Sequence, residues 1–270
     1  MTLDPFYLAT AIEAALEAGR IHRRYFRQAL DVRKKGPIDL VTAADLEVER
    51  MFRARIADRF PDHVVLGEEG GVTTPPPGRC RWIVDPLDGT TNFAHGLGLF
   101  CISIALQIDE RLALGVVYDP IGQELFTAER GSGARVNGRP LAVSTRTDLV
   151  DALVCTGFPY TVRDGRSDQV KVFEAFLTSA QAVRRLGSAA LDLCYVAAGR
   201  FDGFWEQELN PWDVAAGALI IEEAGGTVTG YDGGPLDVFA RHILATNGPL
   251  HGPMLDVIKK TRSGLFFDKM

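Results

Sequence analysis

The spacing of apolar residues predicts two helices at the start of the chain. The first begins near residue 6 and continues to about residue 28, with Leu8 and Ile12 on its apolar face. The segment Lys34-Lys35-Gly36-Pro37 interrupts this pattern, because glycine and proline break helices. Thr42-Ala43-Ala44-Asp45 then has the form of a variant capping box, which predicts that a second helix begins there.

Short apolar runs separated by turn residues predict strands farther along the chain. These runs cover residues 64–66, 81–84, 101–108, 112–118 and 124–128. Asp119-Pro120-Ile121-Gly122 and Asn137-Gly138 are typical of turns between neighbouring strands. The middle of the chain is therefore predicted to be an antiparallel meander. The proline-rich segment 73–78 is predicted to be a surface loop.

Strand-like and helical patterns alternate in the second half of the chain. Strands are predicted at 153–155, 182–184 and 203–205, and helices at 170–180, 189–198 and 214–224. Helix-rich and strand-rich parts are partly segregated, which is typical of a layered α+β protein. The 270 residues contain no repeat, so a single domain is expected, with halves of about 1–145 and 146–270.

Charge and hydropathy limit the classes of molecule that the protein is expected to bind. The chain has 35 acidic and 29 basic residues and a formal charge of -6, which argues mildly against nucleic acid or an anionic membrane as its main partner. A phosphate substrate stays compatible with this charge, because bound divalent cations reverse the local sign. Stretches long enough to cross a membrane (about 20 apolar residues) or to direct secretion are not recognisable in the sequence.

The four cysteines favour free thiols over disulfides or a zinc site. Cys80, Cys101, Cys155 and Cys194 lie far apart, and three of them sit inside apolar runs. This usage fits a reducing compartment, so a cytoplasmic location is expected.

The segment 82–93, Trp-Ile-Val-Asp-Pro-Leu-Asp-Gly-Thr-Thr-Asn-Phe, carries the clearest candidate chemistry. Residues 81–84 are predicted to end a buried strand, with Asp85 at its carboxyl edge and Pro86 preventing further ladder pairing. Asp88-Gly89-Thr90 has the composition of a helix N-cap. Two carboxylates beside helix N-terminal amides can hold hard cations and a phosphate. A plain turn is the alternative, since Asp-Pro and Asp-Gly are common turn formers.

Further carboxylates follow apolar or aromatic residues elsewhere. Glu68-Glu69 follows the strand predicted at 64–66, and Asp213 follows Asn210-Pro211-Trp212. Several carboxylates held in fixed directions suit Mg²⁺. Zinc is disfavoured, because the histidines are scattered at positions 22, 63, 95, 242 and 251. Surface acidity for the two glutamates and a helix N-cap for Asp213 remain alternatives.

Two motifs resemble a known family. Asp85-Pro86-Leu87-Asp88-Gly89-Thr90-Thr91 resembles the first signature of the inositol monophosphatases, and Trp212-Asp213-Val214-Ala215-Ala216-Gly217, continuing to Glu222-Glu223-Ala224-Gly225-Gly226, resembles the second. The resemblance extends from about residue 8 to about residue 247. It implies a layered αβαβα sandwich shared with fructose-1,6-bisphosphatase, and a homodimeric, lithium-sensitive, Mg²⁺-dependent phosphatase.

The resemblance also implies roles for individual residues in metal and phosphate binding. Matching residues are the metal ligands Glu68, Asp85, Asp88, Asp213 and the Leu87 carbonyl, for two or three Mg²⁺ ions. Glu68 and Thr90 would orient and activate a water, with Asp45 as the acidic partner of Thr90. The amides of Gly89 and Thr90 would hold the phosphate. A capping residue within Thr42-x-x-Asp45 is the alternative for Asp45. No covalent nucleophile is implied.

A second set of residues matches family positions that surround the rest of the substrate. Asp88 and Asp213 would border it, as would Arg184 and the amides of Gly187, Ser188 and Ala189. Taken alone, without the resemblance, the segment 184–193 indicates ordinary αβ packing. Glu206 matches a glutamate that contacts substrate hydroxyls, which suits a polyol. Lys34 aligns with a lysine near the metals, with a solvated loop lysine as the alternative.

The substrate is less firmly predicted than the reaction. Thr91-Asn92-Phe93 resembles the inositol-type enzymes, and Gly157-Phe158-Pro159 is similar to bacterial members that accept several phosphomonoesters. We therefore expect myo-inositol monophosphate, with fructose 1,6-bisphosphate, histidinol phosphate or another sugar phosphate as alternatives. A regulatory binding protein that keeps the fold, and a metal-dependent lipid or nucleotide phosphohydrolase, are further alternatives. The complete set of expected carboxylates favours the enzyme.

Overall fold

The computed structural model describes residues 3–28, 33–34, 40–70, 80–164 and 168–264. The loop predicted at 73–78 and most of the predicted helix break lie outside these ranges. The strands of the N-terminal half form the larger sheet, in the order β3-β4-β5-β6-β7-β8-β9. Their bounds are β3 (Val64–Gly67), β4 (Arg81–Asp88), β5 (Cys101–Ile108), β6 (Arg111–Asp119), β7 (Glu124–Glu129), β8 (Ala134–Val136) and β9 (Arg139–Pro140). β3 is parallel to β4, and the later neighbours are antiparallel, which confirms the predicted meander.

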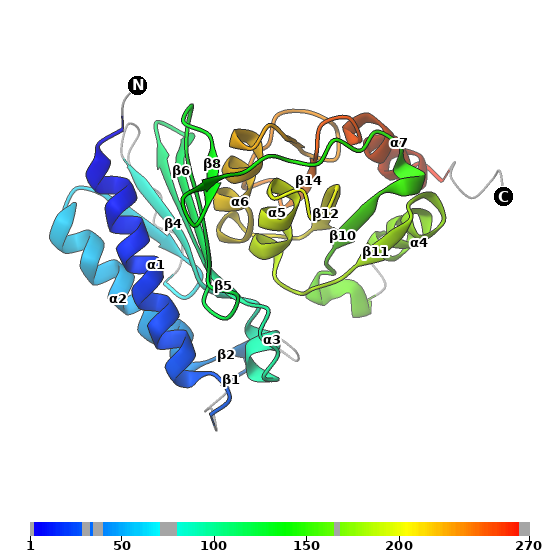
Figure 1. Cartoon of the computed structure of the whole chain (residues 1–270). Coiled ribbons are helices and arrows are strands. Elements are labelled where there is room, and N and C mark those ends of the chain that lie inside the picture. Colours follow the sequence, from blue (N-terminus) through cyan, green and yellow to red (C-terminus); the bar gives the residue numbers. More distant parts are fainter. Residues whose placement is uncertain (1–2, 29–32, 35–39, 71–79, 165–167, 265–270) are drawn as a thin grey trace.

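The predicted N-terminal helices cover one face of the larger sheet (Figure 1). α1 (Pro5–Tyr25) contacts β6 and α2 (Ala43–Arg59) contacts β4. Ala11, Ala14, Ala15 and Ala18 of α1 are fully buried, and these short side chains allow the helix to lie close to the sheet. The capping box predicted at Thr42 and Asp45 is present at the start of α2. A short ribbon of β1 (Arg33–Lys34) and β2 (Leu40–Val41) connects the two helices.

The opposite face of the larger sheet packs on a central helical layer. This layer contains α5 (Ala189–Ala197) and α6 (Pro211–Glu223), which are buried along nearly their whole length because a sheet lies on each side. Figure 1 shows both helices between β5 and β6 on one side and β12 and β14 on the other. The α6 helix begins three residues earlier than predicted, because Asn210 caps it and Pro211 fits the first helical position.

The smaller sheet completes the stack. Its strand order is β11-β10-β12-β14-β13, with α4 (Gln169–Ser179) and α7 (His251–Arg262) on the outer face. The strand bounds are β10 (Leu153–Thr156), β11 (Ala182–Arg184), β12 (Gly203–Gln207), β13 (Thr227–Thr229) and β14 (His242–Thr246). The layers therefore run α, β, α, β, α, which confirms the predicted fold class. The last two strands and α7 were not anticipated from the sequence pattern.

Two further predictions concern the whole chain. The cysteines are free thiols, with three buried and Cys80 partly exposed, as expected. Among the described residues, no helix is both long and apolar enough to cross a membrane.

Candidate active site

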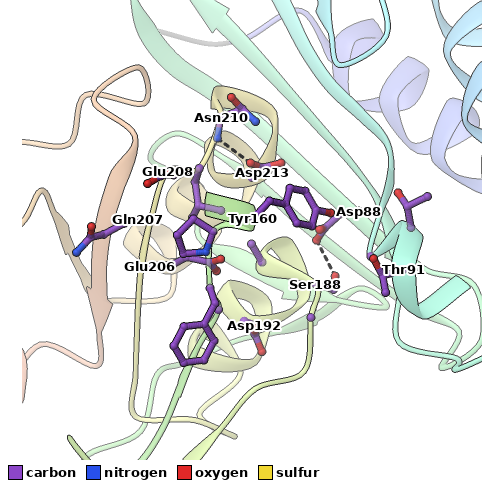
Figure 2. Close-up of a pocket in the computed structure, with 18 of the residues that line it drawn as sticks. Asp88, Thr91, Tyr160, Ser188, Asp192, Glu206, Gln207, Glu208, Asn210 and Asp213 are labelled. Carbon is purple, nitrogen blue, oxygen red and sulfur yellow. Dashed lines mark hydrogen bonds between the residues drawn. The ribbon is translucent and has the colours of Figure 1, made fainter. Parts of the chain in front are cut away.

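A cavity of about 600 Å³ opens where the two halves of the protein meet (Figure 2). It lies at the ends of β4 and β12 and at the N-termini of α3 (Thr90–Ala94), α5 and α6. The structure brings most of the residues predicted from the sequence to this cavity. Those lining it are Glu68, Asp85, Leu87, Asp88, Gly89, Thr90, Gly187, Ser188, Ala189, Glu206 and Asp213.

A bulge at the end of β4 places Asp85 and Asp88 together. The sequence predicted that the strand ends at Val84. In the structure β4 instead continues to Asp88, with a register shift in its pairing with β5. Asp85 pairs with Ser103 and Asp88 with Cys101, so β4 carries one extra residue over this interval. Because side chains alternate along a strand, the extra residue turns both carboxylates toward the same face.

Asp88 is held by the N-terminus of α5. Its Oδ2 accepts hydrogen bonds from Ser188 Oγ at 2.6 Å and from Ala190 N at 2.8 Å, and Cys101 Sγ lies 3.8 Å away. Figure 2 shows Ser188 directed at Asp88. The Ser188 side chain is buried, so its hydroxyl orients this aspartate. These contacts fix one carboxylate oxygen and leave Oδ1 for another ligand.

Asp85 and Asp213 are anchored in the same manner. Leu87 N donates to Asp85 Oδ1 at 2.9 Å, and Asn210 N donates to Asp213 Oδ2 at 2.7 Å. Asp213 is the third residue of α6 in a capping box with Asn210, so it is not the N-cap considered from the sequence. In each of the three aspartates, a backbone N–H binds one oxygen and sets the direction of the other.

The three aspartates create a concentration of negative charge. Burial and the charges of Glu68, Asp88 and Asp213 raise the pKa of Asp85 well above its usual range. Burial and the Asp88 charge raise the pKa of Asp213 to about 8. Among the described residues, no arginine or lysine forms an ion pair with any of the three aspartates. The donor set of hard, fixed oxygens with uncompensated charge fits Mg²⁺.

A second acidic group adjoins the three aspartates. One oxygen from each of Asp45, Glu68 and Glu69 lies within 4.8 Å of the others, which makes this group a possible cation site. Burial raises the pKa of Asp45 to about 6, although hydrogen bonds from Thr42 oppose this. Asp45 Oδ2 accepts from Thr42 N at 2.9 Å, while Asp45 Oδ1 lies 3.4 Å from Thr90 Oγ1. Asp45 therefore caps α2 with one oxygen and contacts Thr90 with the other.

Gly89 and Thr90 form the turn that leads into α3. Gly89 has a φ of 93°, and a Cβ there would lie 2.8 Å from the Leu99 carbonyl oxygen, so only glycine fits. Thr90 Oγ1 donates to Leu87 O at 2.9 Å. The first N–H groups of a helix have no partner within it and are available to an anion.

Glu49 supports the acidic group and was missed from the sequence. It is buried on α2, one turn after Asp45, and its Oε2 accepts from Glu69 N at 2.8 Å. Its Oε1 accepts from Arg53 Nε at 2.8 Å. Glu49 thus holds the turn that carries Glu68. The Glu49–Arg53 pair, four residues apart, could be recognised in the sequence. The hydrogen bond from Glu69 N, 20 residues away, could not.

The other end of the cavity is lined by buried acids. Burial and the Asp213 charge raise the pKa of Glu206 to about 8, and the Arg185 charge opposes this. Gly157 lies against the Glu206 carboxylate, where a Cβ would collide with it. Asp192 was not anticipated from the sequence; burial raises its pKa strongly, and its Oδ1 has no hydrogen-bond partner in the described structure.

The two neighbouring arginines differ from the prediction. Arg184 is exposed, donates to the Val183 carbonyl oxygen and does not line the cavity, whereas Arg185 does. The placement of Arg184 at the substrate is therefore not supported, because β11 ends at Arg184 and the chain turns toward the cavity one residue later. Lys34 belongs to β1, but its side chain lies outside the described part.

Comparison with known proteins places this geometry in context. The inositol monophosphatase family model matches residues 5–263. Inositol-1-monophosphatase of Mesorhizobium japonicum is 44% identical over 258 residues, covering 95% of this chain and 97% of the relative. Nus factor SuhB of Pseudomonas aeruginosa is 42% identical over 260 residues, covering 93% and 95%.

Solved structures agree in fold. The inositol monophosphatase of Anabaena superposes with a TM-score of 0.86 at 42% identity, covering 94% of this chain and 96% of that one. The Thermotoga maritima enzyme gives a TM-score of 0.88 at 36% identity, covering 96% and 99%. With a family match over nearly the whole chain, full-length relatives and the same layered fold, this protein belongs to the inositol monophosphatase family.

Proposed function

We propose that the protein is a Mg²⁺-dependent phosphomonoesterase that hydrolyses myo-inositol monophosphate to inositol and phosphate. The observation that carries this proposal is the set of Asp85, Asp88 and Asp213 at one cavity. Each has one oxygen held by a backbone N–H, and no cationic side chain among the described residues pairs with them. Uncompensated carboxylates with fixed directions are suited to divalent cations.

The chain's own residues divide the work around that centre. Asp85, Asp88, Asp213, Glu68 and the Leu87 carbonyl would hold divalent cations, which supply the positive charge that phosphoryl transfer needs and make water a better nucleophile. No covalent intermediate with the protein is required.

Proton handling falls to Asp45, Glu68 and Thr90. Thr90 Oγ1 lies 2.9 Å from Leu87 O and 3.4 Å from Asp45 Oδ1. With its one proton turned from Leu87 O to Asp45, the hydroxyl would accept a proton from an attacking water and give its own to the Asp45 carboxylate. The pKa of Asp45, about 6 because of burial, suits proton acceptance near neutral pH. Glu68 would orient the same water.

Phosphate and alcohol would bind at different walls of the cavity. Gly89 and Thr90 line the cavity at the start of α3, and their amides would hold the phosphate. Glu206 would hydrogen-bond the hydroxyl groups of a polyol, and the backbone at Gly187 to Ala189 would border the ring. The name of the Mesorhizobium relative supports inositol monophosphate as the preferred substrate.

A regulatory role is the second candidate function. Relatives called Nus factor SuhB are 40–42% identical to this chain, close to the 43–44% of relatives called inositol-1-monophosphatase. A role in binding a macromolecular partner is therefore compatible with the same fold, and the expectation of no nucleic-acid partner is not established. The two functions are separable, because only the phosphatase requires the carboxylate oxygens that face the cavity.

Phosphate release from a panel of esters tests the proposal. Purified protein would be assayed with Mg²⁺ on inositol 1-phosphate, fructose 1,6-bisphosphate and histidinol phosphate. The highest kcat/KM is expected for inositol 1-phosphate. A higher value for either other ester would overturn the substrate assignment. If none of the three esters is hydrolysed, the proposed phosphatase activity is wrong and the regulatory role becomes the leading candidate function.

A further inference from the structure

A buried histidine outside the proposed reaction lies directly beneath the candidate metal site. His22, near the end of α1, has no exposed surface. Its ring meets Phe93 and Phe100 edge to face, with centroid distances of 6.2 and 5.8 Å. Its Nδ1 has no hydrogen-bond partner within the described residues. Burying a ring nitrogen without a hydrogen-bond partner is unfavourable for stability. The hydrogen bond made by the other nitrogen, Nε2, therefore calls for an explanation.

That hydrogen bond reaches the loop between two predicted metal ligands. His22 Nε2 lies 2.8 Å from the carbonyl oxygen of Pro86. A carbonyl oxygen can only accept, so Nε2 carries the proton and donates it. Burial lowers the pKa of His22 to about 4, which leaves the ring neutral at physiological pH.

The acceptor belongs to the same peptide group that holds Asp85. The Pro86 carbonyl and the Leu87 N–H are the two ends of one planar unit. His22 binds the oxygen end at 2.8 Å, while the nitrogen end donates to Asp85 Oδ1 at 2.9 Å. A tilt of this plane would move the N–H away from Asp85.

The sheet does not hold this peptide in place by itself. The pairing of β4 with β5 is interrupted between Asp85 and Asp88, and Pro86 has no N–H to contribute to a ladder. The hydrogen bond from His22 reaches this peptide from a helix 64 residues earlier in the chain.

We infer that His22 is a positioning residue for the metal site, acting through the Pro86–Leu87 peptide on the Asp85 carboxylate. This inference rests on the proposed function, because it concerns the affinity of the site for its cation. A packing role alone makes a different prediction. Phenylalanine would fill the same aromatic pocket and would remove the unpaired Nδ1, so packing alone would leave metal binding unchanged.

Metal binding to the metal-free protein tests the inference without relying on turnover. Dissociation constants for Mg²⁺ by calorimetry and for Mn²⁺ by electron paramagnetic resonance would be measured for wild type, His22→Phe and His22→Met. Both variants lack the donor. Removing a partner of a metal-ligating side chain weakens binding about ten- to hundredfold, and His22 acts one peptide farther away. We expect about three- to tenfold weaker binding in either variant.

Thr10→Val is the matched control. Thr10 is a buried polar residue on the same helix whose hydroxyl accepts from Arg59 at 3.0 Å, away from the cavity. The affinity of the Thr10→Val variant for Mg²⁺ and Mn²⁺ is expected to stay within twofold of wild type. His22→Gln, whose amide nitrogen can reach the position of Nε2, is expected to recover most of the lost affinity.

The outcomes separate the inference from the proposed function. Wild type that binds no divalent cation would contradict the proposed function. If the wild type binds Mg²⁺ and either His22→Phe or His22→Met binds it equally tightly, the positioning role of His22 is wrong. The proposed function would not be affected by that result. Should neither variant fold, nitrogen NMR of the wild-type histidines decides: a protected Nε2–H on His22 is expected, and the Nδ1–H tautomer would overturn the inference.

Discussion

Replacing Asp213 with asparagine is expected to abolish activity while stabilising the metal-free protein. Asparagine keeps an oxygen that can accept from Asn210 N, so the start of α6 stays capped. The change removes the charge and replaces the other carboxylate oxygen with an amide nitrogen. In the absence of a cation, that buried charge is repelled by the charges of Asp88 and Glu68 and opposes folding.

The magnitude follows from the pKa of Asp213. In the unfolded chain this carboxyl ionises near 3.8, whereas burial and Asp88 raise its pKa to about 8 in the folded protein. Folding therefore favours the protonated form, and the free energy of unfolding falls as the pH rises from about 4 to about 8. A shift of about four units corresponds to an upper limit of roughly 6 kcal/mol. The carboxyl faces the cavity, where solvent screens it, so about 2 kcal/mol is expected.

Urea unfolding in EDTA at several pH values measures this effect. The stability advantage of Asp213→Asn is expected to be small near pH 4, to grow with pH and to level off above pH 8. Asp256→Asn, at an exposed position on α7, should change the free energy of unfolding by less than about 0.5 kcal/mol. Excess Mg²⁺ should reverse the order, because binding stabilises the wild type more. A less stable Asp213→Asn in EDTA at pH 8.5, or an advantage independent of pH, would refute the reasoning.

Three other substitutions test separate parts of the site. Ser188→Ala removes the 2.6 Å hydrogen bond to Asp88 and is expected to weaken Mg²⁺ binding about tenfold in calorimetry, while unchanged binding would show that Ala190 N suffices. Gly157→Ala places a methyl group against the Glu206 carboxylate. In steady-state kinetics, KM for inositol 1-phosphate should therefore rise more than kcat falls. An unaltered KM would argue against recognition of substrate hydroxyls by Glu206. Glu49→Ala leaves the part-buried Glu69 N–H without its acceptor and Arg53 without its ion-pair partner, so the free energy of unfolding in urea should fall by about 2 kcal/mol. Glu49→Gln should recover part of this loss, and equal stability of the two variants would contradict this role.

Local pattern and motif were sufficient to predict the layers of the fold and most of the cavity wall. The capping box at Thr42, the meander from Cys101 onward and the presence of a buried strand over residues 81–84 are all local, and each is confirmed. For Asp45 the sequence left a capping role and a catalytic role open, and the geometry is compatible with both. One carboxylate oxygen caps the helix, and the other lies 3.4 Å from Thr90 Oγ1.

Long-range contacts account for what the sequence did not predict. Ser188 lies 100 residues from Asp88, and only the packed structure shows that its hydroxyl orients this aspartate. Pro86 indicated a strand end because it cannot join a ladder, but the bulge lets β4 resume at Asp88. Arg184 and Arg185 are indistinguishable in sequence, and the end of β11 decides which of them reaches the cavity.

The rate of phosphate release as a function of Mg²⁺ concentration tests the central claim most directly. Wild type and Asp85→Asn would be compared with inositol 1-phosphate as substrate, after removal of metal with EDTA. The account predicts saturable dependence on Mg²⁺ for the wild type, and a rate at least about a hundredfold lower for Asp85→Asn at any Mg²⁺ concentration. Turnover that persists in EDTA, or an Asp85→Asn rate close to that of the wild type, would contradict it.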